Sequence, residues 1–248
     1  MVNVIDYRPG TSLLHRLNPV AKLALASAII FSTLLSSSYV MLIGFLCVTL
    51  GLAVYAGVLS AMLKLLKILV PIVLVMLLIQ LLLVRSGTPL LGFVTDEALI
   101  TGSKACLRLL GVALPLVLML MVTKLTDVAN ACVELLHIPY RYAFTFTTAL
   151  RFVPVFSQEM DAIMEAQTAR GVAFDAKNPF KRLQLMLPLC IPLLVSSVGK
   201  TDATALAAEQ RGFYLRNRES SFKRYPLRGL DIACLMGCIL LLVLAVMF

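Results

Sequence analysis

Two Arg–Gly pairs are the residues of this chain whose types and spacing best suit chemistry with a partner. Arg170–Gly171 and Arg211–Gly212 each follow an alanine that lies four residues before the arginine, and each precedes a phenylalanine. A planar guanidinium pairs with a carboxylate through two parallel hydrogen bonds. A cation in the last turn before a terminating glycine is also ordinary helix capping, which explains one pair more readily than two. The repetition therefore predicts two arginines presented to acidic groups of a partner.

Two other motifs resemble enzyme sites but lack residues that the chemistry needs. Gly199–Thr201 ends like a phosphate-binding P-loop, yet Leu194 stands where that loop requires its first glycine. Ala169–Arg170 also occurs in membrane-embedded head-group transferases, but no Asp-Gly precedes it and the nearby acids lack paired metal-ligand spacing. The six scattered cysteines and two histidines suggest neither a disulfide framework nor a metal site. We therefore expect no catalytic residue, cofactor or metal in this chain.

The composition is that of an integral membrane protein. Apolar residues make up 60% of the 248 residues and charged residues only 14%, with a mean hydropathy of +0.94. The net charge of +9 is concentrated between Lys124 and Arg228, which hold 14 Lys and Arg against 9 Asp and Glu. This block is too apolar and too mixed in sign for a nucleic-acid partner. Because cationic residues collect on the cytoplasmic side, it predicts a cytoplasmic region held against the membrane.

The apolar runs predict an all-α integral membrane fold with about five transmembrane helices, and up to seven, whose N-terminus is cytoplasmic. Two aromatic or proline-containing runs, 138–156 and 183–198, are candidates to dip into the membrane. We expect a four-helix transmembrane region in residues 1–123, a coupling domain in 124–228 and a last transmembrane helix in 229–248. The five predicted spans are residues 23–38, 39–59, 68–84, 109–122 and 230–248.

Several helix boundaries follow from local signals. Pro71 is predicted to lie in the first turn of its span, where its missing N–H costs little. Lys104 and Arg108 are predicted to lie outside the membrane, unless that helix begins earlier. The two Arg-ended helices are predicted to begin at the caps Ser157 and Thr201, and the alanine-rich surface of the second suits a close crossing of the two.

The chain resembles the transmembrane T component of energy-coupling factor (ECF) transporters, a family that includes cobalt-transport permease subunits. Ser12–Lys22 is similar to the family's Ser-x-Leu-His-x-Leu-Asp-Pro-x-x-Lys, with Asn18 where aspartate is usual. Arg151–Pro154 matches Arg-Phe-x-Pro, and Ala169–Gly171 matches the first Ala-Arg-Gly motif. The second motif, Gln210–Gly212, keeps Arg and Gly and replaces Ala, which affects only local packing.

The resemblance implies a non-catalytic coupling subunit of the cell (inner) membrane. Its partners would be two ABC ATPase subunits, which bind ATP and Mg²⁺, and a substrate-binding membrane S component for a vitamin or a metal ion. ATP-driven closure of the ATPases would move two crossing cytoplasmic helices. The implied ATPase-coupling residues are Ala169, Arg170, Gly171, Gln210, Arg211 and Gly212, supported by Arg151, Pro154 and Glu165.

Other interpretations remain open at this point. A pore-forming permease of an ordinary ABC importer carries one coupling loop that begins Glu-Ala-Ala, and Glu165, Ala166 and Gly171 meet its spacing. Two Arg-ended helices and the scarcity of ionisable residues in the spans favour the T component. A membrane-embedded transferase is less favoured still. The aromatic stretch from Tyr140 to Phe156 is predicted either to dock the S component or to pack on the chain's own spans.

Overall fold

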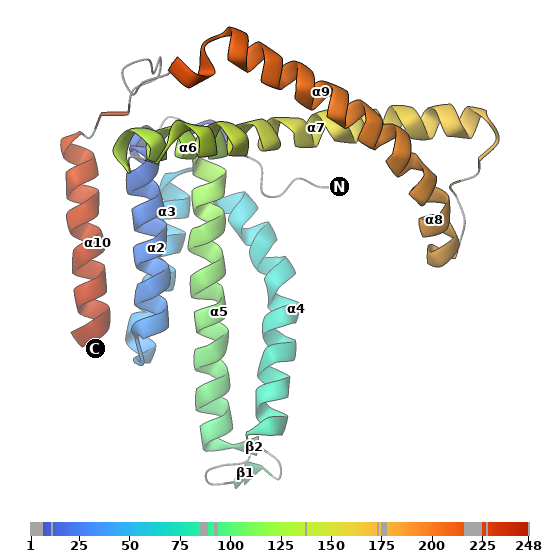
Figure 1. Ribbon diagram of the computed structural model, residues 1–248. Helices are drawn as coiled ribbons and strands as arrows, with labels where there is room; N and C mark the ends of the chain where they lie inside the picture. The colour runs from blue at the N-terminus through green and yellow to red at the C-terminus, as the bar shows by residue number, and fades with distance from the viewer. Residues whose placement is uncertain are drawn as a thin grey trace. The chain divides into compact units, whose positions relative to one another are not determined.

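The computed structural model describes residues 7–10, 12–84, 89–91, 94–136, 138–172, 174, 178–215, 225–226 and 228–247. Nearly all of them are helical (Figure 1), apart from one short antiparallel strand pair. The chain forms two compact units: unit 1 runs to Leu136 and resumes at Tyr225, and unit 2 comprises the residues between. The all-α membrane fold predicted from the sequence is confirmed.

Unit 1 holds seven of the helices and both strands. They are α1 (Leu13–Arg16), α2 (Pro19–Leu35), α3 (Tyr39–Tyr55), α4 (Leu59–Leu83), β1 (Pro89–Leu91), β2 (Val94–Thr95), α5 (Asp96–Val122), α6 (Leu125–Leu135) and α10 (Gly229–Met247). Unit 2 holds α7 (Tyr140–Ala169), α8 (Pro179–Met186), the 3₁₀ turn η1 (Leu187–Leu189), α9 (Cys190–Gln210) and the 3₁₀ turn η2 (Phe213–Leu215).

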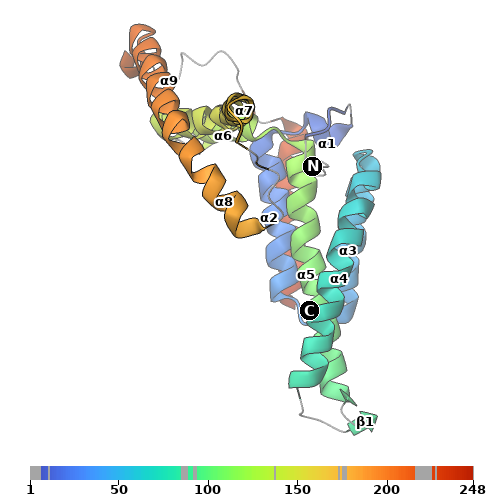
Figure 2. The same ribbon diagram turned by 90° about the vertical axis from the view of Figure 1, so that its right-hand side faces the viewer.

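Helix α5 is the centre of unit 1. It packs against α2, α3 and α4, while α10 and α6 pack on α2 (Figures 1 and 2). Leu114 and Met121 of α5 are fully buried against Ala61 and Met62 of α4. Since α2, α3 and α4 cover different faces of α5, this helix contributes the most buried residues to unit 1, while Leu99, Ile100 and Leu116 stay exposed on its remaining surface.

Four helical stretches of the described residues are long and apolar enough to cross a membrane: α4, α5, α10 and the stretch from Leu183 to Gln210. Helices α2 and α3 have 17 residues each, or about 25 Å, which is the lower end of a spanning length. Of the five predicted spans, α4, α5 and α10 are long and apolar enough to cross a membrane, and the other two correspond to the shorter helices α2 and α3. The stretch from Leu183 to Gln210, part of which was predicted to dip into the membrane, is the fourth candidate.

Helix α4 begins earlier than predicted. It starts at Leu59, so Pro71 lies inside the helix and not in its first turn, and the prediction for Pro71 is wrong. The residues before Pro71 are mainly Leu, Met, Ala and Lys, which are strong helix formers. Their combined propensity extends the helix by more than two turns, and one proline in an otherwise packed helix does not interrupt it.

Helix α5 also begins earlier than its apolar run. Because it starts at Asp96, Lys104 and Arg108 lie within the helix. One Arg108 Nη donates a hydrogen bond of 2.9 Å to the Ser36 carbonyl, and the Lys104 ammonium lies 5.0 Å from the centre of the Tyr39 ring. The alternative that this helix begins earlier is therefore the correct one, and both cations contact the region where α2 ends and α3 begins.

A buried carboxylate ties the beginnings of α2 and α10 together. Asp231, only 2% exposed, accepts hydrogen bonds of 2.7 Å from the backbone N–H groups of Asn18 and Arg228. Asn18 caps α2 through its side-chain oxygen, which accepts from the N–H of Val20. The free N–H groups at two helix starts thus share one anionic acceptor, which the helix dipoles also favour.

Tyr225 closes unit 1 where the chain returns from unit 2. Its N–H donates to a Glu134 carboxylate oxygen at 2.7 Å and its hydroxyl to an Asp127 oxygen at 3.0 Å. Both acids belong to α6, which ends one residue before Leu136. The chain therefore leaves unit 1 and returns to it at one place, and α6 and Tyr225 belong to unit 1 although both lie within the predicted block 124–228.

Unit 2 is built on two long helices that begin before the predicted caps. Ser157 lies inside α7, which starts at Tyr140, and Thr201 lies inside α9, which starts at Cys190. Both cap predictions are wrong. A cap contributes about 1 kcal/mol, whereas each residue added to an existing helix gains a backbone hydrogen bond. Within the proline-containing run 183–198, the 3₁₀ turn η1 separates α8 from α9.

Candidate functional site

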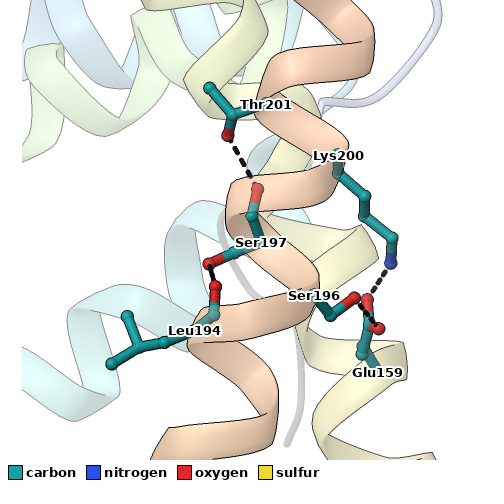
Figure 3. A network of polar contacts seen from close by, with 6 residues as sticks. All are labelled: Glu159, Leu194, Ser196, Ser197, Lys200 and Thr201. Atoms are coloured by element: carbon teal, nitrogen blue, oxygen red, sulfur yellow. Dashed lines mark hydrogen bonds and ion pairs between the residues drawn. The ribbon is translucent and has the colours of Figure 1, made fainter.

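Helices α7 and α9 cross where Glu159 of α7 meets Ser196 and Lys200 of α9 (Figure 3). The Ser196 hydroxyl donates to one carboxylate oxygen of Glu159, and the Lys200 ammonium pairs with the other. The Glu159 side chain is 21% exposed. Because partial shielding from water strengthens a charged contact relative to an open surface pair, this cluster is the polar anchor of the crossing.

The two helices run in opposite directions. The Tyr140 ring at the start of α7 lies 5.7 Å from the Phe213 ring, which follows the end of α9. Farther along α7, Glu159 meets Lys200, which lies earlier in the chain than Phe213. Residue numbers therefore rise along α7 while they fall along its partner, and the two Arg–Gly ends lie on opposite arms of the crossing.

The two arms have the same length. Glu159 lies eleven residues before Arg170, and Lys200 lies eleven residues before Arg211. Eleven residues are close to three turns, or about 16 Å of helix, and they return the side chain to nearly the same face. Each arginine is therefore carried at the end of a rigid arm, on the face that its helix turns toward the crossing.

Helix α7 ends at a glycine in the left-handed region. Gly171 has φ +91° and donates its N–H to the Thr168 carbonyl at 2.9 Å, while the Val172 N–H reaches the Gln167 carbonyl at 3.1 Å. These two bonds form a Schellman motif, which only glycine adopts without strain. The predicted helix end is confirmed, and it leaves Arg170 as the last residue before the chain turns away.

Helix α9 ends in a related but different way. Gly212 has φ +73° and donates to the Glu209 carbonyl at 2.9 Å, after which η2 continues the chain. The Phe213 ring then packs on the first turns of α7, 4.8 Å from the centre of the Phe144 ring. This second predicted end is also confirmed. Unlike the first, it is fastened to the opposite helix by an aromatic cluster.

Both arginines are available to a partner. Arg170 and Arg211 are exposed, and within the described residues neither guanidinium makes a hydrogen bond or an ion pair. The preceding residues Ala169 and Gln210 are exposed too. Replacing alanine by glutamine in the second motif therefore removes no buried packing, and the difference between the two motifs leaves the arginine unaffected.

The structure brings only one supporting residue to an arginine end. Arg151 lines the same groove as Arg211, although the two are sixty residues apart in sequence. Pro154 lies one turn farther along α7 and is exposed. Glu165 is exposed on the arm that carries Arg170, and it makes no ion pair within the described part of the chain.

The P-loop-like triplet has a structural role in the crossing. Gly199, Lys200 and Thr201 lie inside α9, so their backbone N–H groups are used by the helix and form no loop around a phosphate. Lys200 pairs with Glu159, and the Thr201 hydroxyl donates to the Ser197 carbonyl at 2.8 Å (Figure 3).

An apolar stripe on α9 is a feature that the sequence reasoning missed. Ile191, Leu194, Val195 and Val198 are all exposed, and their spacing places them on one face, opposite Lys200. The signal was present as the spacing i, i+3, i+4, i+7 within residues 191–198. It was hidden because the segment was treated as a short kinked run and not as half of a long helix.

Comparison with known proteins identifies the family. The family described as cobalt transport protein (CbiQ) matches residues 10–221. The energy-coupling factor transporter transmembrane protein EcfT of Acidaminococcus fermentans is 35% identical, over 83% of this chain and 81% of the relative. The EcfT proteins of Bacillus subtilis and Lacticaseibacillus paracasei are 30% and 32% identical, over 95% and 84% of this chain and 93% and 83% of the relatives.

These matches extend from the N-terminal motif through both Arg–Gly ends, and they agree with the resemblance based on residues 12–22, 151–154, 169–171 and 210–212. They favour the T component over an ordinary permease or a transferase. The chain is a multi-pass membrane protein that belongs to the CbiQ cobalt transport family and is a transmembrane T component of an energy-coupling factor transporter.

Proposed function

We propose that this chain transmits the ATP-driven motion of two ABC ATPase subunits to a substrate-binding membrane subunit. The observation that supports this proposal is the symmetry of unit 2. Arg170 and Arg211 end two antiparallel helices, each three turns from one crossing, and neither has a partner within the described residues. Two equivalent arms with one cation each fit two nucleotide-binding subunits, which hold the ATP and Mg²⁺.

The coupling step follows from the stiffness of the arms. Each arginine pairs with a carboxylate of one ATPase subunit, and the adjoining glycine turns the chain away so that the helix tip is open. When the ATPases close, both tips move, and the helices rotate or slide about the contact between Glu159 and Lys200. Ala169 and Gln210 flank the docked arginines, Glu165 lies on the arm that ends at Arg170, and Pro154 lies on α7 before the crossing.

The S component is the receiver of this motion. The exposed stripe of α9 and the exposed Tyr142, Phe146 and Val153 of α7 are apolar surfaces that suit a membrane-embedded partner. A vitamin or a transition-metal ion is the cargo, and its binding site belongs to the S component. The description of the family as cobalt transport proteins supports the metal ion, whereas the relatives are named only for energy coupling.

The orientation that we propose places the N-terminus and unit 2 in the cytoplasm. Arg16 belongs to α1, Lys64 and Lys67 to the first turns of α4, and Lys124 directly follows α5 and precedes α6; these segments gather at the end of unit 1 from which the chain leaves for unit 2 (Figure 1). The other half of unit 1 carries Lys104 and Arg108 of α5. The opposite end carries the strand pair β1–β2. Cationic residues collect on the cytoplasmic side, so this asymmetry supports the orientation.

The test replaces both arginines in the complete complex. The double variant Arg170→Gln and Arg211→Gln should abolish ATP-dependent uptake of cobalt ion or of a vitamin in cells, and should reduce recovery of the ATPases with the tagged chain. Truncating one side of a charge-assisted pair across an interface costs about 2–5 kcal/mol. Each single variant should be milder because the other arm still docks.

Arg141→Gln is the matched control, since Arg141 is exposed on α7 but already bonds the neighbouring Tyr142 hydroxyl at 2.9 Å. It should leave uptake unchanged. Full uptake and normal ATPase recovery in the double variant would contradict the proposal. Recovery of two ATPases and a small membrane protein with the wild-type chain would also identify the cargo, through the bound ligand of that protein.

A further inference from the structure

A groove lies beside Arg211 in unit 2. It has a volume of about 630 Å³ and lies between the first half of α7 and the end of α9. That size is within the range of sites that hold a ligand or a docked side-chain cluster. Its lining residues are Tyr140, Phe144, Thr148, Arg151, Phe152, Thr204, Ala207, Ala208, Arg211, Gly212, Phe213 and Leu215.

The charge of this groove is unbalanced. Arg151 and Arg211 are its only charged lining residues, and no aspartate or glutamate lines it. Neither guanidinium has an ion pair or hydrogen bond within the described residues. Two cations that share one hollow repel each other, and an anion between them relieves the repulsion and pairs with both. The groove is therefore complementary to a negatively charged group.

An aromatic cluster holds the two cations in place. The rings of Tyr140, Phe144 and Phe213 lie 6.0, 5.7 and 4.8 Å apart in pairs, and they fasten η2 to α7. Because Phe213 follows directly after Gly212, this cluster sets the position of the Arg211 end relative to Arg151. Aromatic walls also exclude water and strengthen a charged contact made beside them.

The described residues around the Arg170 end are more open than those around Arg211. A Cβ atom added at Gly171 would meet nothing within 4 Å, whereas one at Gly212 would lie 3.7 Å from the Leu215 side chain. The basic groove lined by Arg151 lies at the Arg211 end. The two arms are therefore alike in length but unlike in what surrounds their arginines.

We propose that this groove receives an acidic segment of one ATPase subunit, with Arg151 as a second cation that contacts the carboxylate docked at Arg211. This rests on the proposed function, which assigns Arg211 to an ATPase, and it goes further by making the two docking ends unequal. The ATPase at the Arg211 end pairs with two guanidiniums and an aromatic wall. The ATPase at the Arg170 end pairs with one exposed guanidinium.

The experiment isolates each end in turn. The full-length chain is placed with its S component in nanodiscs of neutral lipid, and the affinity of labelled ATPase is measured by titration. In an Arg170→Gln background, where only the groove end docks, Arg151→Gln should weaken the affinity about tenfold, as expected for one charge-assisted hydrogen bond. In an Arg211→Gln background the same change should have no effect.

Two further variants fix the interpretation. Arg151→Lys keeps the charge but loses the two parallel N–H donors of the guanidinium. Its affinity for the ATPase should therefore fall between those of wild type and Arg151→Gln. Arg141→Gln, on the same helix but outside the groove, should match wild type in both backgrounds. Both are surface changes on α7, and recovery of the intact complex by size-exclusion chromatography checks folding.

Three outcomes would overturn the proposal. Arg151→Gln could behave as Arg141→Gln does, or it could weaken binding equally in both backgrounds, which is a general charge effect. It could instead change only the binding of nanodiscs that contain phosphatidylglycerol, which would make the groove a lipid site. Failure of the proposed function is distinct, because then Arg170→Gln and Arg211→Gln together would leave ATPase affinity unchanged.

Discussion

Helix α5 of unit 1 and helix α9 of unit 2 are both long and apolar, yet they are held in place differently. In the most apolar stretch of α5, 44% of the residues are buried, against 6% for the stretch that contains α9. Helix α9 buries none of its residues, and the 30-residue helix α7 buries only Ala143. Unit 1 thus has a packed core, whereas the described part of unit 2 buries few side chains and includes the polar crossing and the ring cluster among its contacts.

This difference in burial matches the roles proposed for the two units, in which unit 1 is fixed and unit 2 moves. Burial of apolar side chains is the main favourable term in folding, so α5 stays fixed against its neighbours. Two helices that touch at only a few points separate at a low cost in free energy. Elements that move in proteins usually belong to such weakly packed regions. In the proposed function, unit 1 holds the membrane position while unit 2 changes its crossing geometry.

The largest expected loss of stability follows from removing the buried Asp231 carboxylate of unit 1. Asp231→Ala leaves the N–H groups of Asn18 and Arg228 without an acceptor. Each unsatisfied buried donor costs about 1–3 kcal/mol. We expect a loss of about 2–5 kcal/mol in unfolding free energy, measured by denaturant titration of the purified protein. Asp202→Ala removes an exposed carboxylate of α9 and should change little. Equal losses in both variants would break the distinction between the units.

A pair of glycines tests the difference in packing density. A Cβ atom at Gly111 of α5 would lie 2.5 Å from Cγ2 of the buried Thr33, whereas one at Gly199 of α9 would meet nothing within 4 Å. Gly111→Ala should therefore lower the free energy of unfolding by about 1–3 kcal/mol through overpacking. Gly199→Ala should raise it by about 0.5–1 kcal/mol, because alanine loses less backbone entropy in a helix. Thermal unfolding in detergent measures both, and opposite signs would sharpen the comparison.

The smallest expected effect is at the crossing of unit 2. Glu159→Gln keeps the shape and an acceptor for Ser196 but loses the charge that pairs with Lys200, a loss of about 1 kcal/mol for a partly exposed pair. Amide hydrogen exchange should accelerate in the middle of α7 and α9 and remain unchanged in α5. Glu165→Gln, an exposed glutamate on the same helix, serves as the control. Unchanged exchange at the crossing would mean that other contacts hold unit 2 together.

Local signals predicted some features well and others poorly. The left-handed ends at Gly171 and Gly212 were predictable, because a glycine after a helical cation has few other uses. The starts at Ser157 and Thr201 were not, because capping preference is weak compared with the continuation of a helix. The helical position of Pro71 was missed for the same reason.

The sequence alone determined the membrane class, the five apolar spans and the two Arg–Gly ends, since apolar content and glycine conformation are properties of local residues. It also carried the motifs of the family. Only the tertiary structure decided which distant residues meet: Asp231 with Asn18, Glu159 with Lys200, and Arg151 with Arg211 in one groove. Such pairings depend on how helices far apart in the chain pack, and no local pattern encodes that geometry.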